Sequence, residues 1–244
     1  MEAQVEILQS LLKPAEPMVL ATVVDVRGSS PAKPGFKILV PAGGATVGSA
    51  GGGGLEQNVV ADARECLASG KPALRSYKLT ESGTGMWCGG EVTVFFEPYL
   101  PPATVWIFGY GHVGREVSQL VASAGFRCVI AHDQDIAGLD VQKISWDTLS
   151  PFPEIGRSDF VLVLTMNHET DMKILVRLAE TRPRYVGVIG SKRKGEKLVE
   201  ELAKRGIDAA GLNLHVPVGL PIHAVTPREI AISIAAELIR EKNG

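Results

Sequence analysis

The periodicity of apolar and polar positions changes at a pair of prolines, Pro101-Pro102. Before this pair, apolar residues at helical spacing predict helices, and runs rich in aliphatic and β-branched residues predict strands. The predicted order is helix, strand, strand, helix and strand, over residues 5–12, 18–26, 36–40, 55–67 and 91–96. Paired prolines fit neither kind of element, so we place a domain boundary there and expect a small N-terminal α+β domain over residues 1–100.

After the prolines, buried strands alternate with amphipathic helices. Largely apolar segments at 105–108, 127–131, 160–164 and 185–189 predict strands, and the continuous apolar run at 160–164 is typical of a strand covered on both faces. Apolar residues at helical spacing follow these runs, and the last helix opens with the capping box Thr226-Pro227-Arg228-Glu229. This alternation predicts a Rossmann-like, doubly wound parallel sheet over residues 103–244.

Composition and charge exclude several classes of protein. The chain has 244 residues, of which 45% are hydrophobic and 21% charged, and its net charge is −2, so no basic field favours nucleic acid or an anionic membrane. No uncharged apolar run approaches the roughly 20 residues of a membrane-spanning helix. The three cysteines indicate neither a disulfide framework nor a zinc knuckle, and the first residues lack the basic stretch of a signal peptide. We therefore expect a cytoplasmic protein.

A glycine fingerprint opens the second block. The segment Gly109-Tyr110-Gly111-His112-Val113-Gly114 lies between a predicted buried strand and a predicted helix. In this pattern Gly109 permits a tight turn, Gly111 lets a phosphate approach the backbone and Gly114 lets the helix pack closely. Unpaired amides and the helix dipole would favour an anion there, with His112 inside the turn. The alternative is a turn that only maintains the fold.

The position of the ribose-binding acid is ambiguous. That acid is expected at the end of the second strand, where the chain reads Ala131-His132-Asp133. Asp133 could bind a ribose, but His132 can equally occupy the aligned position. Binding of NAD(P) or another nucleotide therefore stays open. An NAD(P)-dependent oxidoreductase would need a proton-transfer residue such as His168, and a nucleotide-sensing module is a third possibility.

Two further strand ends carry polar residues. His168 follows the strand at 160–164, and Ser191 follows the strand at 185–189 and precedes three basic residues. Ligands of open parallel sheets collect at the carboxyl ends of the strands, so both residues are candidates for cofactor binding. The alternatives are a polar helix-entry residue for His168 and, for Ser191, a helix cap before a solvated basic turn.

The first block has its own glycine cluster, which runs from Gly48 to Gly54 and leads into Glu56. The consecutive glycines are Gly51, Gly52, Gly53 and Gly54. Successive backbone amides ahead of a helix can form an anion-binding concavity. A flexible connection is the alternative, with Glu56 only complementing the helix dipole.

Cys88 is the cysteine that lies outside an apolar periodic segment. It is followed by Gly89 and Gly90, and in such a loop nearby amides could stabilise a thiolate that binds a soft metal or carries sulfur. Cys66 falls on a helical apolar stripe and Cys128 in a predicted strand, so we expect both in the core.

Taken together, these segments resemble the XdhC/CoxI family of accessory proteins for molybdenum hydroxylases such as xanthine dehydrogenase. The resembling segments fall in order over most of the chain: 21–24 with 28–31, 47–56, 88–90, 109–114, 188–194 and 226–231. The resemblance implies a small N-terminal domain followed by a Rossmann-like domain. It also implies a protein that is not itself expected to turn over a substrate.

The implied function is to bind molybdenum cofactor (molybdopterin), to support the exchange of its oxo ligand for a sulfido ligand, and to deliver it to the apo-hydroxylase. The glycine runs would then cradle the phosphate of the pterin, and Cys88 would be the soft thiolate near the metal. A cysteine desulfurase-type sulfur donor and a homodimer belong to the same expectation. Many members carry a second cysteine where this chain has Gly54, so a mechanism that needs two thiols does not follow.

Overall fold

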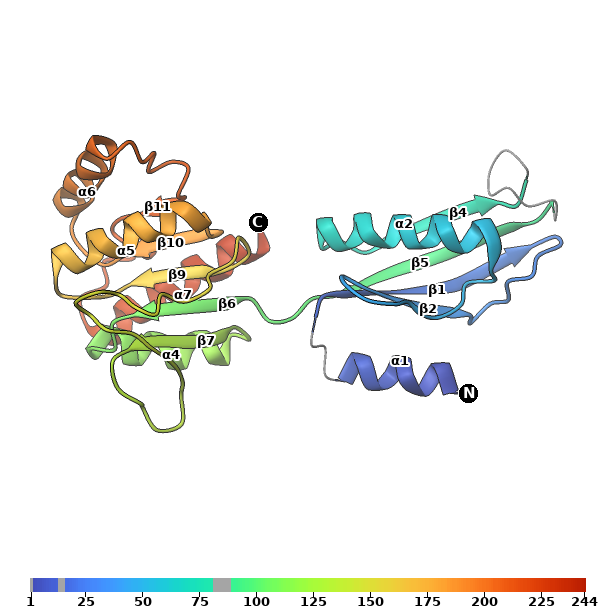
Figure 1. Cartoon of the computed structure of the whole chain (residues 1–244), viewed down its shortest axis with the longest axis horizontal. Helices are drawn as coiled ribbons and strands as arrows, with labels where there is room; N and C mark the ends of the chain where they lie inside the picture. The colour runs from blue at the N-terminus through green and yellow to red at the C-terminus, as the bar shows by residue number, and fades with distance from the viewer. Residues whose placement is uncertain (1, 13–15, 81–88) are drawn as a thin grey trace. The chain divides into compact units, whose positions relative to one another are not determined.

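A computed structural model of the chain describes residues 2–12, 16–80 and 89–244 (Figure 1). The chain divides into two compact units, residues 1–101 and 102–244, each with its own elements. The N-terminal unit contains α1 (Glu2–Leu12), β1 (Met18–Arg27), β2 (Lys37–Pro41), β3 (Val47–Gly48), α2 (Gly53–Ser69), β4 (Ala73–Lys78) and β5 (Glu91–Tyr99). The C-terminal unit contains β6 (Thr104–Phe108), α4 (His112–Ser123), β7 (Arg127–His132), β8 (Asp140–Lys143), β9 (Phe160–Val163), α5 (His168–Thr181), β10 (Tyr185–Val188), α6 (Lys192–Lys204), β11 (Leu214–His215) and α7 (Pro227–Asn243).

The N-terminal unit is an antiparallel sheet in the order β3-β2-β1-β5-β4, with a helix on each face (Figure 1). Val92, Val94 and Phe96 alternate along β5 and are buried, so this strand, predicted over 91–96, has one core face. They belong to a core that α2 completes with Leu55 and Val59. A smaller apolar cluster forms where α1 packs on the other face.

The C-terminal unit is a parallel sheet in the order β11-β10-β9-β6-β7-β8, and this confirms the predicted doubly wound fold. Helices α4 and α7 pack on one face of the sheet, and α5 and α6 on the other (Figure 1). The chain starts with β6 in the middle of the sheet and continues to one side as far as β8. It then returns to β9 on the other side of β6. A ligand crevice is expected outside the carboxyl ends of β6 and β9, where the strand order reverses.

Several helix ends follow the predicted signals. Ser191 caps α6 by accepting a hydrogen bond from the amide of Lys194, and Thr226 and Glu229 form the capping box of α7. Gly70 ends α2 in the left-handed conformation, with a φ of 65°. None of the helices in the described parts of the chain is long and apolar enough to cross a lipid bilayer.

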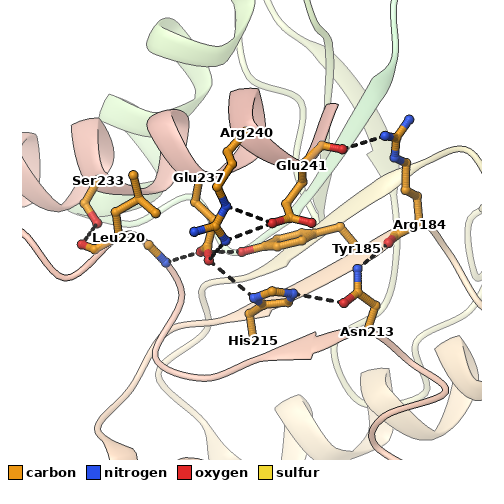
Figure 2. Close-up of polar contacts among 10 residues, drawn as sticks. Arg184, Tyr185, Asn213, His215, Leu220, Ser233, Glu237, Arg240 and Glu241 are labelled. Carbon is orange, nitrogen blue, oxygen red and sulfur yellow. Dashed lines mark hydrogen bonds and ion pairs between the residues drawn. The ribbon is translucent and has the colours of Figure 1, made fainter. Parts of the chain in front are cut away.

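A buried carboxylate fastens α7 to the segment that follows β11 (Figure 2). Glu237 is only 5% exposed, and it accepts hydrogen bonds from the Tyr185 hydroxyl at 2.7 Å and from the Gly219 amide at 2.6 Å. Its second oxygen lies 3.3 Å from Nδ1 of His215 and 3.1 Å from the guanidinium of Arg240. The last helix, the start of β10 and β11 are therefore connected through one side chain.

Candidate functional site

The three fingerprint glycines differ in what a side chain would meet. Gly109 has a φ of 106°, and a Cβ there would lie 2.7 Å from the carbonyl oxygen of Leu164. A Cβ on Gly114 would lie 2.3 Å from the carbonyl oxygen of Gly109, so the helix can pack closely on the turn. Gly111 has an ordinary φ of −77°, and a Cβ there would meet nothing within 4 Å. Gly111 therefore borders open space.

The first turn of α4 has amides without a side-chain partner. Its N-cap residue is Gly111, and no side chain accepts a hydrogen bond from the first-turn amides. These amides and the positive end of the helix dipole are available to an anion.

A cavity of about 760 Å³ opens at this turn, at the carboxyl ends of β6, β7, β9 and β10. Residues from six segments of the C-terminal unit line it: 109–115, His132, Trp146, 164–167, Thr170 and Ile189. The described residues that line the cavity include no aspartate or glutamate. They include Arg115, whose guanidinium lies 5.6 Å from the ring centroid of Tyr110. The lining therefore favours an anionic ligand.

At the end of β7, His132 lines the cavity and Asp133 does not. The Asp133 side chain is 46% exposed, with its carboxylate 3.0 Å from Nδ1 of His132. The amide of Gln134 donates a hydrogen bond to the same Nδ1 at 3.1 Å. The His132 ring meets the ring of Trp146 edge-on, with centroids 6.1 Å apart. An imidazole ring, and not a carboxylate, therefore faces the cavity at the end of β7.

The structure does not bring His168 and Ser191 to this cavity. His168 is the first residue of α5 and lines a separate cavity of about 490 Å³ together with Glu169 and Lys197. The Ser191 hydroxyl accepts from the Lys194 amide as a helix cap. At the start of α5 the cavity is lined instead by Asn167, whose side chain caps that helix.

The residues in or beside the cavity that were not predicted from the sequence include Thr165, Trp146 and Asp171. Thr165 and Trp146 line it, and the completely buried Asp171 accepts a hydrogen bond from the Thr165 hydroxyl at 2.5 Å. A signal for Asp171 does exist in the sequence. It shares the helical spacing of the buried residues Ile174 and Leu175, and a carboxylate on an apolar stripe requires a partner.

In the N-terminal unit, the glycine run forms a defined turn. Gly51, Gly52 and Gly53 have positive φ values of 123°, 78° and 58°. The hydroxyl of Ser49 donates to the Glu56 carboxylate at 2.7 Å and accepts from the Gly51 amide at 3.1 Å. Glu56 is therefore engaged within the loop, and α2 begins without a side-chain cap.

The glycine motifs of the N-terminal unit meet the turn between β1 and β2. A Cβ on Gly90 would lie 2.2 Å from the carbonyl oxygen of Ser29, and one on Gly51 would lie 2.9 Å from Cβ of Ala32. The amide of Gly89 donates to the carbonyl oxygen of Leu79 at 2.9 Å. These close approaches bring the turn, the glycine run and Gly89-Gly90 together at one end of the N-terminal sheet.

The predicted thiolate and metal ligand, Cys88, lies outside the described residues. Burial raises the pKa of the Cys66 thiol, and burial raises the pKa of Cys128 to about 12, so neither thiol favours ionisation. Within the described parts of the chain, no three histidine, cysteine or acidic residues are grouped to hold a metal ion.

Two family models match this sequence. One is described as the XdhC Rossmann domain and matches residues 105–238. The other is described as the XdhC and CoxI family and matches residues 11–78. Together they include the glycine run at 51–54 and the fingerprint at 109–114, whereas Gly89-Gly90 and β5 lie between the two matched ranges.

Individual relatives agree with these matches. Uncharacterized protein YqeB of Escherichia coli (strain K12) is 32% identical, over 93% of this chain and 44% of its own length. A Bacillus subtilis (strain 168) protein, named as a probable xanthine dehydrogenase subunit, is 23% identical over 96% of both chains. A crystal structure described as a xanthine dehydrogenase from Bacillus halodurans has a TM-score of 0.51 and 25% identity, over 98% of this chain and 95% of that one. The chain thus spans less than half the length of the first of these proteins.

Proposed function

The chain belongs to the XdhC and CoxI family, and from this premise we propose that it is an accessory factor for a molybdenum hydroxylase of the xanthine dehydrogenase type. In this role it binds molybdenum cofactor, supports the replacement of an oxo by a sulfido ligand, and delivers the cofactor to the apo-enzyme. The observation that carries the proposal is the uncapped first turn of α4 at the edge of the cavity, because the pterin of this cofactor bears a phosphate.

The cavity suits such a ligand in size and charge. Its volume of about 760 Å³ is in the range of small-molecule sites. The open space above Gly111 lets a phosphate reach the backbone, and no carboxylate among the described lining residues opposes it. The relatives named as a xanthine dehydrogenase or as part of one support the choice of client enzyme.

Each part of the lining has a separate task in this proposal. The first-turn amides of α4 hold the phosphate, and Arg115 adds a positive charge beside them. Trp146 and His132 offer aromatic surface to the heterocycle. When bound, the cofactor supplies the molybdenum centre whose terminal ligand is exchanged. Cys88, next to Gly89-Gly90, is our candidate for the thiolate that approaches this centre, and a cysteine desulfurase-type protein is the candidate sulfur donor.

The oxidoreductase alternative has weaker support. It requires a proton-transfer group at the nucleotide crevice, and His168 borders a different cavity. It also requires an acceptor for the ribose hydroxyls, whereas the residue at that position of the cavity is His132.

The substitution Gly111→Val tests the phosphate site. The backbone at Gly111, with φ −77° and ψ −162°, accepts a branched residue, and the added side chain enters open space. We expect Gly111→Val to lower the free energy of unfolding by no more than about 1 kcal/mol, because valine is a weaker N-cap than glycine, and to lower retention of molybdenum cofactor at least about tenfold in a co-elution assay. The lost phosphate contacts would account for the effect, since charge-assisted hydrogen bonds contribute about 1.5–3 kcal/mol each.

The matched control is Gly156→Val. Gly156 has no left-handed φ, a Cβ there would approach only Asp159 at 3.7 Å, and it does not line the cavity. Unchanged retention by Gly111→Val would refute the phosphate site. In the same assay, Cys88→Ala tests the proposed thiolate against Cys128→Ala, and equal retention by Cys88→Ala and wild type would remove Cys88 from the site.

A further inference from the structure

A carboxylate that is completely shielded from solvent lies next to the cavity. Asp171 is 0% exposed and sits in the first turns of α5. Burying an unpaired carboxylate costs several kcal/mol, so its partners must offset that cost. These partners are the Thr165 hydroxyl on one oxygen and the Lys194 ammonium on the other.

Lys194 reaches Asp171 by folding back over a glycine. It belongs to the first turn of α6, and a Cβ on Gly190 would lie only 2.4 Å from its Cδ. Its Nζ lies 2.6 Å from Oδ2 of Asp171 and donates to the carbonyl oxygen of Ile189 at 2.8 Å. The basic segment at 192–194 thus directs one of its three charges inward, to the carboxyl end of β10.

This ion pair determines which way the Thr165 hydroxyl points. The hydroxyl has one hydrogen and two acceptors within reach, Oδ1 of Asp171 at 2.5 Å and the carbonyl oxygen of Asn167 at 3.2 Å. The closer, charged acceptor takes the hydrogen. The Asn167 amide donates to the Thr165 oxygen at 3.3 Å, which leaves this oxygen able only to accept a further hydrogen bond. Thr165 lines the cavity.

We infer that the Asp171–Lys194 pair fixes Thr165 as a hydrogen-bond acceptor for an N–H group of the ligand. Thr165 is the binding residue, and Asp171 and Lys194 are positioning residues that act through it. The inference rests on the proposed function and adds the orientation of the ligand. The amino-pyrimidine edge of the pterin, which carries N–H donors, faces the carboxyl end of β9.

A purely structural role would give a different result. Buried ion pairs are weak evidence for stability, since apolar residues of the same shape often serve equally well. A structural pair would make its variants less stable without changing which ligand they prefer. The test therefore compares two ligands that differ at one exocyclic position, an amino donor in one and an oxo acceptor in the other.

The probes are 6-hydroxymethylpterin phosphate and the corresponding lumazine phosphate, in which an oxo group replaces the 2-amino group. Binding to the full chain is followed by the change in tryptophan fluorescence, and the same titration of Trp146→Phe identifies the contribution of Trp146, which lines the cavity. We expect wild type to prefer the pterin by about tenfold, the cost of leaving one buried polar group unpaired. Thr165→Val should abolish the preference, Thr165→Ser should restore it, and the control Thr170→Val, also in the lining, should retain it.

Asp171→Asn should abolish the preference for the pterin. Lys194 favours the amide oxygen on its own side, so the Asn NH₂ group faces Thr165. The Thr165 oxygen then accepts from this NH₂ group and from the Asn167 amide, and it has no lone pair left for an N–H group of the ligand. Equal binding of both probes by wild type, or a preference that Thr165→Val leaves intact, would overturn the inference while the proposed function stands. Binding of neither probe would overturn both.

A measurement without ligand tests the hydrogen bond from the Thr165 hydroxyl to Asp171. The Thr165 hydroxyl proton should exchange slowly and give a nuclear Overhauser contact to Asp171 in wild type by NMR. It should exchange fast in Asp171→Asn. A fast-exchanging proton in wild type would overturn the inference even if the pterin binds.

Discussion

At the scale of single residues, Glu237 shows how a buried charge is stabilised in this protein (Figure 2). Burial alone would raise the pKa of its carboxyl group. Hydrogen bonds from His215, Tyr185 and the Gly219 amide outweigh burial and lower the pKa to about 2. The folded state therefore favours the ionised form of Glu237 more than the unfolded chain does. The free energy of unfolding depends on pH through this group.

The predicted consequence is a loss of stability in acid. A carboxyl group whose pKa is lowered by folding stabilises the fold at pH values above its unfolded-state pKa of 4.5. This contribution disappears as the pH falls from about 4.5 to about 2. The contribution is about 3 kcal/mol for a shift of this size. Urea unfolding should show Glu237→Gln to be less stable than wild type at pH 7, with the difference shrinking toward pH 2. Glu200→Gln, at an exposed position on α6, is the control, and a pH-independent difference for Glu237→Gln would contradict the prediction.

Residue chemistry also explains which site residues the sequence could predict. The fingerprint glycines were found because Gly109 and Gly114 require backbone freedom that only glycine has, and such positions recur at fixed spacing. Whether His132 or Asp133 faces the cavity depends on the residue at which β7 ends. A shift of that end by one residue would exchange the two side chains, and local sequence does not fix the end that closely. Thr165, which lies between β9 and α5, was not found because its proposed role depends on Asp171 of α5 and Lys194 of α6.

At the scale of elements, the helices were predicted well because their signals are local. The apolar stripe and capping box that predict α7 lie within the helix and its first turn. Four strands, β3, β4, β8 and β11, were not predicted. β3 and β11 have two residues each, and β8 reads Asp-Val-Gln-Lys with no buried residue. Strands of this kind form because a neighbouring strand offers hydrogen bonds, and that information is not local.

The capping box leads to a prediction for α7. The Thr226 hydroxyl accepts from the Glu229 amide at 3.3 Å, and the Glu229 carboxylate accepts from the amides of Val225 and Thr226 at 2.8 and 3.0 Å. These backbone hydrogen bonds lower the pKa of Glu229. Thr226→Ala should reduce the free energy of unfolding by about 1 kcal/mol, measured by urea titration. Arg228→Ala, at an exposed position in the same turn, should change it by less than about 0.5 kcal/mol, and equal effects would show that the cap contributes nothing.

At the scale of the whole molecule, the two units differ in how much of their strand topology the sequence predicts. The doubly wound class of the C-terminal sheet follows from strand–helix alternation and was predicted, although its edge strands β8 and β11 were not. In the N-terminal unit the order β3-β2-β1-β5-β4 places β5 next to β1, far away in sequence. The convergence of Gly51 and Gly90 on one turn follows from that pairing, and no local pattern contains it.

The described residues that line the cavity all belong to the C-terminal unit, so binding and folding can be tested on that unit alone. Its two apolar clusters, one on each face of the parallel sheet, are built from residues between 103 and 238. A domain of this size with its own core should fold independently. We expect a fragment of residues 102–244 to unfold cooperatively in urea and to bind the pterin phosphate probe within about threefold of the full chain, since the amides of α4 and Thr165 are all present.

A fragment that folds but binds more than about tenfold more weakly would show that the N-terminal unit supplies part of the binding energy. In that case the glycine turn at Gly51–Gly53 would be the first place to search for the missing contacts.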